Sequence, residues 1–142
     1  MESKIRHGYD ALLVLRAPGS AALVADTVSN KVGIDRIQHG PNVGRYAEYK
    51  FDVVLHVGAG FAAGSDNVYV LNFNTYDAAG LNPVTHHTAT IVVGDLGKSL
   101  VYPFDTGTLA EADPDASLFG IALDVTGTTP SADYWAFISP SA

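Results

Sequence analysis

The chain has 142 residues, which is enough for one domain with its own hydrophobic core. Charged residues make up 16% of the sequence and the net charge is -7, and this acidic balance argues against a nucleic-acid partner. No apolar run approaches the roughly 18 residues of a membrane-spanning helix. The absence of cysteine excludes disulfides and thiolate chemistry. We therefore expect a soluble chain without a signal peptide and without a nucleic-acid or membrane partner.

The N-terminal third carries the weakest structural signals. Residues 9–16 (YDALLVLR) fit either a strand or a short helix, whereas 23–30 (LVADTVSN) and 32–37 (VGIDRI) are typical of short strands. The stretch QHGPNVG at 38–44 is typical of a loop. Chain termini are often loosely held, so we treat residues 1–20 as a candidate N-terminal arm.

The strongest periodic signal is an alternation over residues 46–57 (YAEYKFDVVLHV), which predicts a strand with one buried and one solvated face. Further strands are predicted, in chain order, in VYVLNFNTY (68–76), TATIVVG (88–94), KSLVYPF (98–104, ending near Pro103), SLFGIALDVTG (117–127) and ADYWAFIS (132–139). The apolar faces expected in the core are Tyr49, Phe51, Val53, Leu55 and Val57; Tyr69, Leu71 and Phe73; Phe119, Ile121, Leu123 and Val125; and Tyr134, Ala136 and Ile138.

Turn-forming clusters separate these runs: GAGFAAGSDN, DAAGLNP, GDLGK, DTGTLAEADPDAS and TGTTPSAD. Strands divided by such clusters, with almost no helical periodicity, predict an all-β protein. We expect a single domain over residues 1–142, an antiparallel double-sheet sandwich of the jelly-roll type with about eight strands.

Three glycines in one loop, Gly58, Gly60 and Gly64, have a spacing similar to that of a dinucleotide-binding loop. That motif requires a helix after the glycines, because the helix N-terminus receives the phosphate. Here turn formers follow, Asp66 would repel a phosphate, and a strand is predicted from Val68. The stretch therefore predicts a connection between two strands, and we expect no cofactor.

The pair His86–His87, together with His7, His39 and His56, raises the question of a metal site. Adjacent side chains on a regular strand point to opposite faces, and the sequence has no HxH spacing. We expect His86 and His87 to be exposed loop histidines and expect no bound metal. A pH-sensitive contact at an interface is the alternative.

The acidic run EADPDAS places Glu111, Asp113 and Asp115 at alternate positions, but it lacks the frame of a calcium-binding loop, so we interpret it as a solvated loop. A G-x-S-x-G elbow for a serine nucleophile is absent. Glu48 and Glu111 could form a carboxylate pair for glycoside cleavage, yet Glu48 falls on a face patterned as polar. We expect no enzymatic activity.

The order of features in the last hundred residues resembles that of the small jelly-roll decoration, or cement, proteins of tailed bacteriophage heads. The resemblance spans roughly residues 40–139 and is carried by GRYAEYKFDVVLHVGAG, SDNVYVLNFNTYD and the closing SLFGIALDVTGTTPSADYWAFIS. It implies a homotrimer on the outer surface of the virion capsid that bridges subunits of the major capsid protein. It implies no catalytic residues.

Six residues are expected at a subunit or capsid interface. Phe61 is the main one, because an aromatic side chain amid glycines and alanines has little core to enter. The others are Arg45, Tyr76, His86, His87 and Tyr102. The alternative function is a carbohydrate-binding or host-surface-binding sandwich, for which Tyr46, Tyr76, Tyr102, Tyr134 and Trp135 are candidate sugar platforms.

Overall fold

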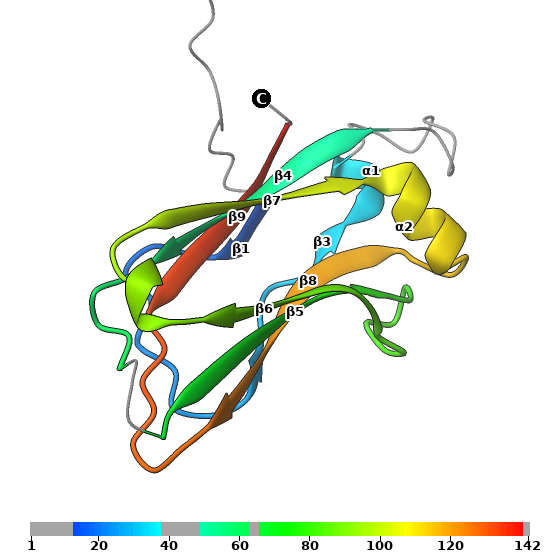
Figure 1. The fold of residues 1–142 in the computed structure, drawn as a ribbon. Helices are drawn as coiled ribbons and strands as arrows, with labels where there is room; N and C mark the ends of the chain where they lie inside the picture. Colours follow the sequence, from blue (N-terminus) through cyan, green and yellow to red (C-terminus); the bar gives the residue numbers. More distant parts are fainter. Residues whose placement is uncertain (1–12, 38–48, 63–65, 141–142) are drawn as a thin grey trace, which may run out of the picture.

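Two antiparallel sheets pack face to face in the computed structural model, which describes residues 13–37, 49–62 and 66–140 (Figure 1). The first sheet has the order β1 (Val14–Arg16), β9 (Tyr134–Pro140), β4 (Lys50–Val57), β7 (Ser99–Asp105). The second has the order β2 (Thr27–Val28), β8 (Leu118–Thr126), β5 (Val68–Tyr76), β6 (Val84–Ile91), and β3 (Val32–Gly33) also pairs with β8. The predicted all-β, two-sheet sandwich is confirmed.

The chain alternates between the sheets. Counting β2 and β3 as one interrupted strand, since both pair with β8, the connections β1–β2, β3–β4, β4–β5, β6–β7, β7–β8 and β8–β9 pass from one sheet to the other. With that counting, β5 and β6 are the one pair of strands that follow each other in the chain and also lie side by side in the same sheet. The crossing from β6 to β7, through the short 3-10 turn η2 (Val93–Asp95), joins the edge strand of one sheet to the edge strand of the other.

The core lies between the sheets, where the apolar faces of the long strands meet. Each of these faces was predicted from period-two alternation, and their central residues are buried: Phe51, Val53, Leu55, Val57, Tyr69, Leu71, Phe73, Phe119, Ile121, Leu123, Tyr134, Ala136 and Ile138. Tyr49 and Val125, at the ends of these runs, are partly buried against the same cluster.

Two short helices were not predicted. α1 (Ile34–Ile37) begins directly after β3, so only the first part of VGIDRI is a strand. α2 (Thr106–Ala112) occupies most of the cluster that we interpreted as a turn. Asp105 caps it by accepting a 2.8 Å hydrogen bond from the Gly107 amide, and Leu109 is buried. Seven residues are too few for a clear helical period.

Three element boundaries differ from the prediction. β1 pairs with β9, so residues 14–16 belong to the sandwich and not to an arm over 1–20; residues 1–12 lie outside the described part. β7 continues through Pro103 to Asp105, which an edge strand tolerates because proline lacks only a donor. β6 begins at Val84, so His86 and His87 lie on a strand and not in a loop.

Candidate functional site

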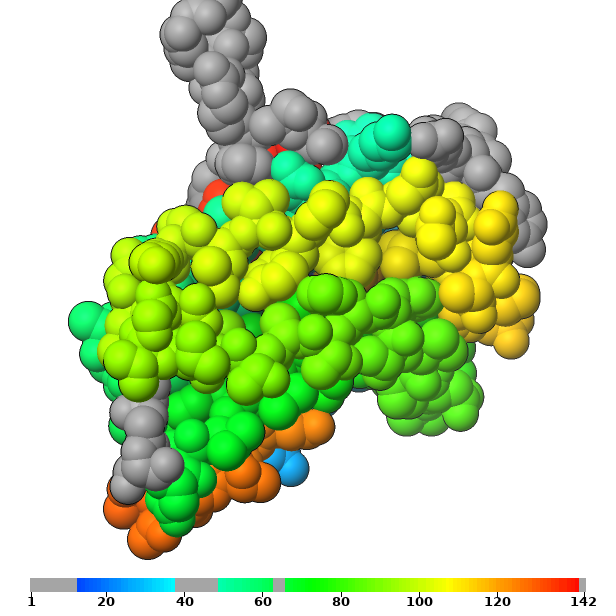
Figure 2. All heavy atoms as spheres, viewed as in Figure 1, coloured from blue at the N-terminus to red at the C-terminus, as the bar shows by residue number. Residues whose placement is uncertain are grey.

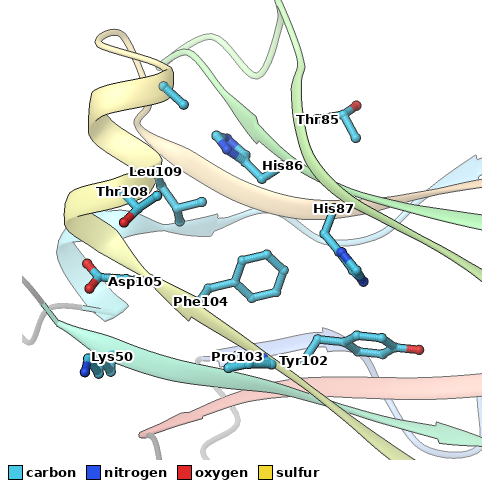
Figure 3. Close-up of a pocket in the computed structure, with 11 residues that line it drawn as sticks. Lys50, Thr85, His86, His87, Tyr102, Pro103, Phe104, Asp105, Thr108 and Leu109 are labelled. Atoms are coloured by element: carbon cyan, nitrogen blue, oxygen red, sulfur yellow. The ribbon is translucent and has the colours of Figure 1, made fainter.

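A groove of about 840 Å³ opens between the edge strands β6 and β7, with α2 at one end (Figures 2 and 3). We call it the β6–β7 groove. It exists because β6 and β7 are the last strands of their sheets, so neither is covered by a further strand of the described chain at this margin. Its lining comes from β4, β6, β7 and α2: Lys50, Thr85, His86, His87, Tyr102, Pro103, Phe104, Asp105, Thr108, Leu109 and Ala112.

A β-bulge directs two adjacent histidines into this groove. Across the β5–β6 pair, Phe73 lies opposite His87 and Asn74 lies opposite Thr85, which leaves His86 as the extra residue. A bulge re-aims the side chains of the strand that contains it. His86 and His87 therefore both line the groove, His86 near α2 and His87 towards Tyr102 (Figure 3). The expectation of opposite faces holds only for a regular strand, and here it is wrong.

A chain of two hydrogen bonds fixes the orientation of His86. The hydroxyl of Thr75 donates to Oδ2 of Asp113 at 2.7 Å. Oγ1 of the same threonine hydroxyl lies 2.7 Å from Nε2 of His86. A hydroxyl has one proton, which here is directed to Asp113, so the network assigns the other proton to Nε2 of His86. Within the described residues no hydrogen bond uses His86 Nδ1. That nitrogen keeps its lone pair available to a ligand.

Burial favours the neutral form of this imidazole. Desolvation lowers the pKa of His86 from its usual value, and the negative charge of Asp113 acts in the opposite direction. Thr75 is fully buried and Asp113 nearly so. A neutral His86 at neutral pH is an acceptor at Nδ1 and a donor at Nε2, so its two nitrogens have different roles.

Aromatic rings form the apolar part of the groove. His87 lies 5.5 Å from Tyr102 and 5.6 Å from the buried Phe73, measured between ring centroids. Phe104 continues the cluster, 5.5 Å from Phe73 and 5.2 Å from Phe119 in the core. Offset and tilted rings at these separations attract each other and resist reorientation. Burial, with a smaller contribution from Asp95, raises the pKa of Tyr102.

Opposite charges meet at the α2 end of the groove. Lys50 and Asp105 lie opposite each other in the β4–β7 register, and both line the groove. Asp105 also caps α2. Charges of opposite sign at neighbouring positions cancel at a distance, so the groove has no strong net charge of either sign.

The structure brings together three of the six predicted interface residues, His86, His87 and Tyr102, all in the β6–β7 groove. Arg45 lies outside the described residues. Tyr76 is 4% exposed and its ring is covered by the Lys31 ammonium at 4.5 Å, so it offers almost no surface to a partner. The prediction for Tyr76 needs correction for that reason.

The prediction for Phe61 is also wrong. Its side chain is 3% exposed and belongs to the core of its own chain, edge-on to Tyr69 with ring centroids 4.7 Å apart. Tyr69 secures the loop, because its hydroxyl donates to the Ala62 carbonyl at 2.8 Å and accepts from the Ser131 amide at 2.9 Å. Residues 58–62 thus lie against the core of their own chain, which gives Phe61 a core to enter.

Close packing against Asp133 explains two of the three glycines in the same loop. A Cβ on Gly58 would lie 2.3 Å from Oδ2 of Asp133, and one on Gly60 would lie 2.9 Å from the same atom. The Gly58 amide donates to the Asp133 carbonyl at 2.7 Å. β5 begins at Val68, as the sequence predicted, so a strand stands where a phosphate-binding helix would be required.

The outward side of the first sheet is a second unusual surface. Val54 and Phe137 are buried, yet neither belongs to the core between the sheets, and Trp135 stacks on Phe137 with centroids 5.4 Å apart. Val101, opposite Val54 in the register, continues this row onto the edge strand and is 45% exposed. The outward sides of sandwich strands usually carry polar residues. We call this row, Trp135, Phe137, Val54 and Val101, the outer apolar row.

The remaining sequence candidates are dispersed. Tyr134 is buried in the core, Trp135 lies in the outer apolar row, and Tyr46 and Glu48 lie outside the described residues, so among the proposed sugar platforms only Tyr102 lines the groove. Asp113 belongs to the hydrogen-bonded chain with Thr75 rather than to a solvated loop. Within the described residues, no three histidine or acidic side chains form a group that could hold a metal.

Sequence reasoning missed Phe104 and Thr75 and interpreted Asp113 as part of a solvated loop, and no local pattern would have identified their roles. Thr75 and Asp113 are 38 residues apart and meet only where the C-terminal end of α2 reaches β5. Neither a protein-family model nor a curated protein matches the chain. Within the described residues, no helix is long and apolar enough to cross a membrane.

Proposed function

We propose that this protein is a non-catalytic decoration protein of a tailed-bacteriophage head, which forms a homotrimer on the outer surface of the capsid and bridges subunits of the major capsid protein. The observation that carries the proposal is a group of three exposed valines at one margin of the sandwich, Val92, Val93 and Val101, of which Val101 continues the outer apolar row onto an edge strand. Exposed apolar side chains grouped on one part of a surface are typical of a surface that contacts another protein.

The strand order supports the finer fold assignment. With β2 and β3 counted as one strand, the two four-stranded sheets interleave so that all successive strands except β5 and β6 change sheet. This nesting is what a jelly roll of two Greek keys requires, and jelly rolls are common among viral capsid proteins. Fold analogy alone does not establish function, so the proposal depends on the surface.

The edges and the exposed valines fit assembly as well. Val101 on β7 and Val92 and Val93 at the β6–β7 crossing are each about half exposed, at 45%, 54% and 60%. A subunit contact over the outward side of β7 would cover Val101 and leave the β6–β7 groove open, and exposed apolar edge strands are otherwise an aggregation hazard. A rigid sandwich that contacts several capsid subunits at once gains avidity and stabilises the assembled shell.

Sedimentation equilibrium of the purified chain tests self-association. We expect the mass of a trimer for the unmodified chain and a shift towards monomer for Val101→Glu, because a carboxylate would be buried at the contact. Val28→Glu is the matched control: Val28 is 48% exposed on β2, in the other sheet, and its substitution should leave the mass unchanged. A monomer at all concentrations would contradict the trimer, and equal effects of the two substitutions would contradict a subunit contact at Val101.

A further inference from the structure

We propose that the β6–β7 groove is a binding site for a neutral sugar ring, with the rings of His87, Tyr102 and Phe104 as the platform and Nδ1 of His86 as an oriented acceptor for a sugar hydroxyl. The proposal does not depend on capsid binding, because the groove lining and the outer apolar row share no residue. It gives the carbohydrate-binding alternative a specific site.

The size and composition of the groove fit a small ligand. Its volume of about 840 Å³ lies within the roughly 300–1,000 Å³ that small-molecule sites occupy. Apolar rings provide most of the contact surface, and a few polar groups can fix orientation. The electron-rich face of an aromatic ring attracts the polarised C–H groups on one face of a pyranose. His87 is tilted by 46° to Tyr102 and by 75° to Phe104, so the rings form the apolar wall of a concave site, with polar groups at its margin, in which one ring face can stack on the sugar.

Several polar side-chain atoms of the groove have no hydrogen-bond partner within the described residues, which argues against a purely apolar ligand. Within the described residues, no hydrogen bond uses His86 Nδ1, the ring nitrogens of His87, the Tyr102 hydroxyl or the Thr108 hydroxyl. An apolar ligand would bury several of them without a hydrogen-bond partner, which is unfavourable for each group. A polyhydroxylated ring both donates and accepts, so it can satisfy histidine acceptors and hydroxyl donors together.

Charge decides against an anionic ligand. Lys50 is the one lysine or arginine in the described lining, and Asp105 lies opposite it in the β4–β7 register. The chain has a net charge of -7, and burial favours the neutral form of His86. An anion would therefore meet no net positive field in the groove. A neutral sugar needs none.

The position of His86 also distinguishes a built site from an accidental hollow. A histidine held only by solvent would sample several rotamers, whereas the Thr75–Asp113 bond fixes both the ring and the location of its proton. Orienting a histidine through its second nitrogen is how proteins set the role of the first. The bulge that admits His86 lies at the groove and not elsewhere along β6.

Saturation-transfer NMR with methyl glycosides of glucose, galactose, mannose and N-acetylglucosamine tests the proposal on the intact chain. We expect saturable binding of at least one of them, weakened tenfold or more by His87→Ala and by Tyr102→Ala. His56→Ala is the matched control, because His56 also contacts an aromatic ring on a strand, Trp135 at 5.8 Å, but lies away from the groove. It should bind as the unmodified chain does.

A second variant separates the acceptor from general packing. His86→Gln keeps a donor for Thr75 at Nε2, but its acceptor Oε1 is bonded to the same carbon as that donor and does not lie where Nδ1 lies in the imidazole. We therefore expect binding to fall while the melting temperature at pH 8 stays near that of the unmodified chain. Four results would overturn the proposal: no saturable binding of any of the four glycosides, binding only of a sialylated probe, preferential binding of an extended peptide, or equal effects of His87→Ala and His56→Ala.

Discussion

Thr75 and Asp113 lie 38 residues apart and are joined by a 2.7 Å hydrogen bond that connects the second sheet to the C-terminal end of α2. The bond is buried, and Oγ1 of Thr75 also contacts Nε2 of His86 at 2.7 Å. One hydroxyl thus positions a helix that borders the groove and a histidine that lines it. The stability of the groove should depend on this hydroxyl.

Thr75→Val retains the shape of the side chain and removes the hydroxyl. We expect the free energy of unfolding to fall by about 2–3 kcal/mol, because the Asp113 carboxylate and the His86 donor both lose a partner. Thr88→Val is the control, since Thr88 is exposed and its hydroxyl donates to Oδ1 of Asn72 at 3.0 Å in an exposed bond, and it should cost less than about 1 kcal/mol. Urea titration at pH 7 gives both values. Equal losses would show that the buried chain contributes no more than a surface bond.

Acid should destabilise the fold through His86. Its pKa is lowered in the folded chain, chiefly by desolvation, so the unfolded chain binds more protons in the interval from the usual value of 6.5 down to the folded value. Stability is therefore complete above pH 6.5 and is lost as the pH falls through that interval. The facing charged group, Asp113, reduces this effect without reversing it.

The substitution His86→Gln should flatten the dependence of stability on pH below 6.5. Gln at this position does not titrate but can donate to Thr75. His87→Gln is the control, because His87 is exposed and makes no contact with the Thr75–Asp113 chain. Urea midpoints measured from pH 8 to pH 5 give the slopes. If His86→Gln and the unmodified chain lose stability in parallel, His86 does not carry the acid response.

Phe61→Ala should destabilise the folded monomer by about 3–5 kcal/mol, the usual cost of removing a buried phenylalanine. The loss should be the same at low and high protein concentration, since Phe61 packs on Tyr69 within its own chain. Chemical denaturation at two concentrations separated tenfold checks this. A loss of stability that appears only at the higher concentration would instead place Phe61 at a subunit interface.

Gly58→Ala should destabilise the chain by about 1–3 kcal/mol, because its Cβ would meet Asp133 within 3 Å on both side-chain and backbone atoms. Gly94→Ala is the control: nothing lies within 4 Å of a Cβ there, and the change should be neutral or slightly stabilising. Thermal unfolding of the two variants compares them. Equal melting temperatures would contradict the role assigned to Asp133.

The sequence predicted the two-sheet fold and its core faces because alternation is unambiguous over long strands. Lys50–Val57 and Val68–Tyr76 are long enough for the inward set to be identified without any partner. The sequence did not predict the β6–β7 groove, because the groove depends on which strands lie at the edges of their sheets. The bulge at His86 depends on the register between β5 and β6, and no single strand contains that information.

Phe61 shows a different limit of sequence reasoning. A loop of small residues was expected to have no core of its own, but its neighbours in the sequence do not determine its environment. The hydroxyl of Tyr69 holds the loop against the core of its own chain through the Ala62 carbonyl. α2 was missed for a related reason: Asp105 is a recognisable cap, but only Leu109 and Ala110 mark its apolar side.

Binding to phage heads tests the proposed function most directly. The purified chain should be mixed with heads of its proposed phage that lack it, assembled from the major capsid protein alone, and then pelleted. We predict saturable co-sedimentation with a fixed ratio of three chains per site, and loss of binding for Val101→Glu but not for Val28→Glu. A chain that stays in the supernatant at saturating head concentration would contradict the assignment.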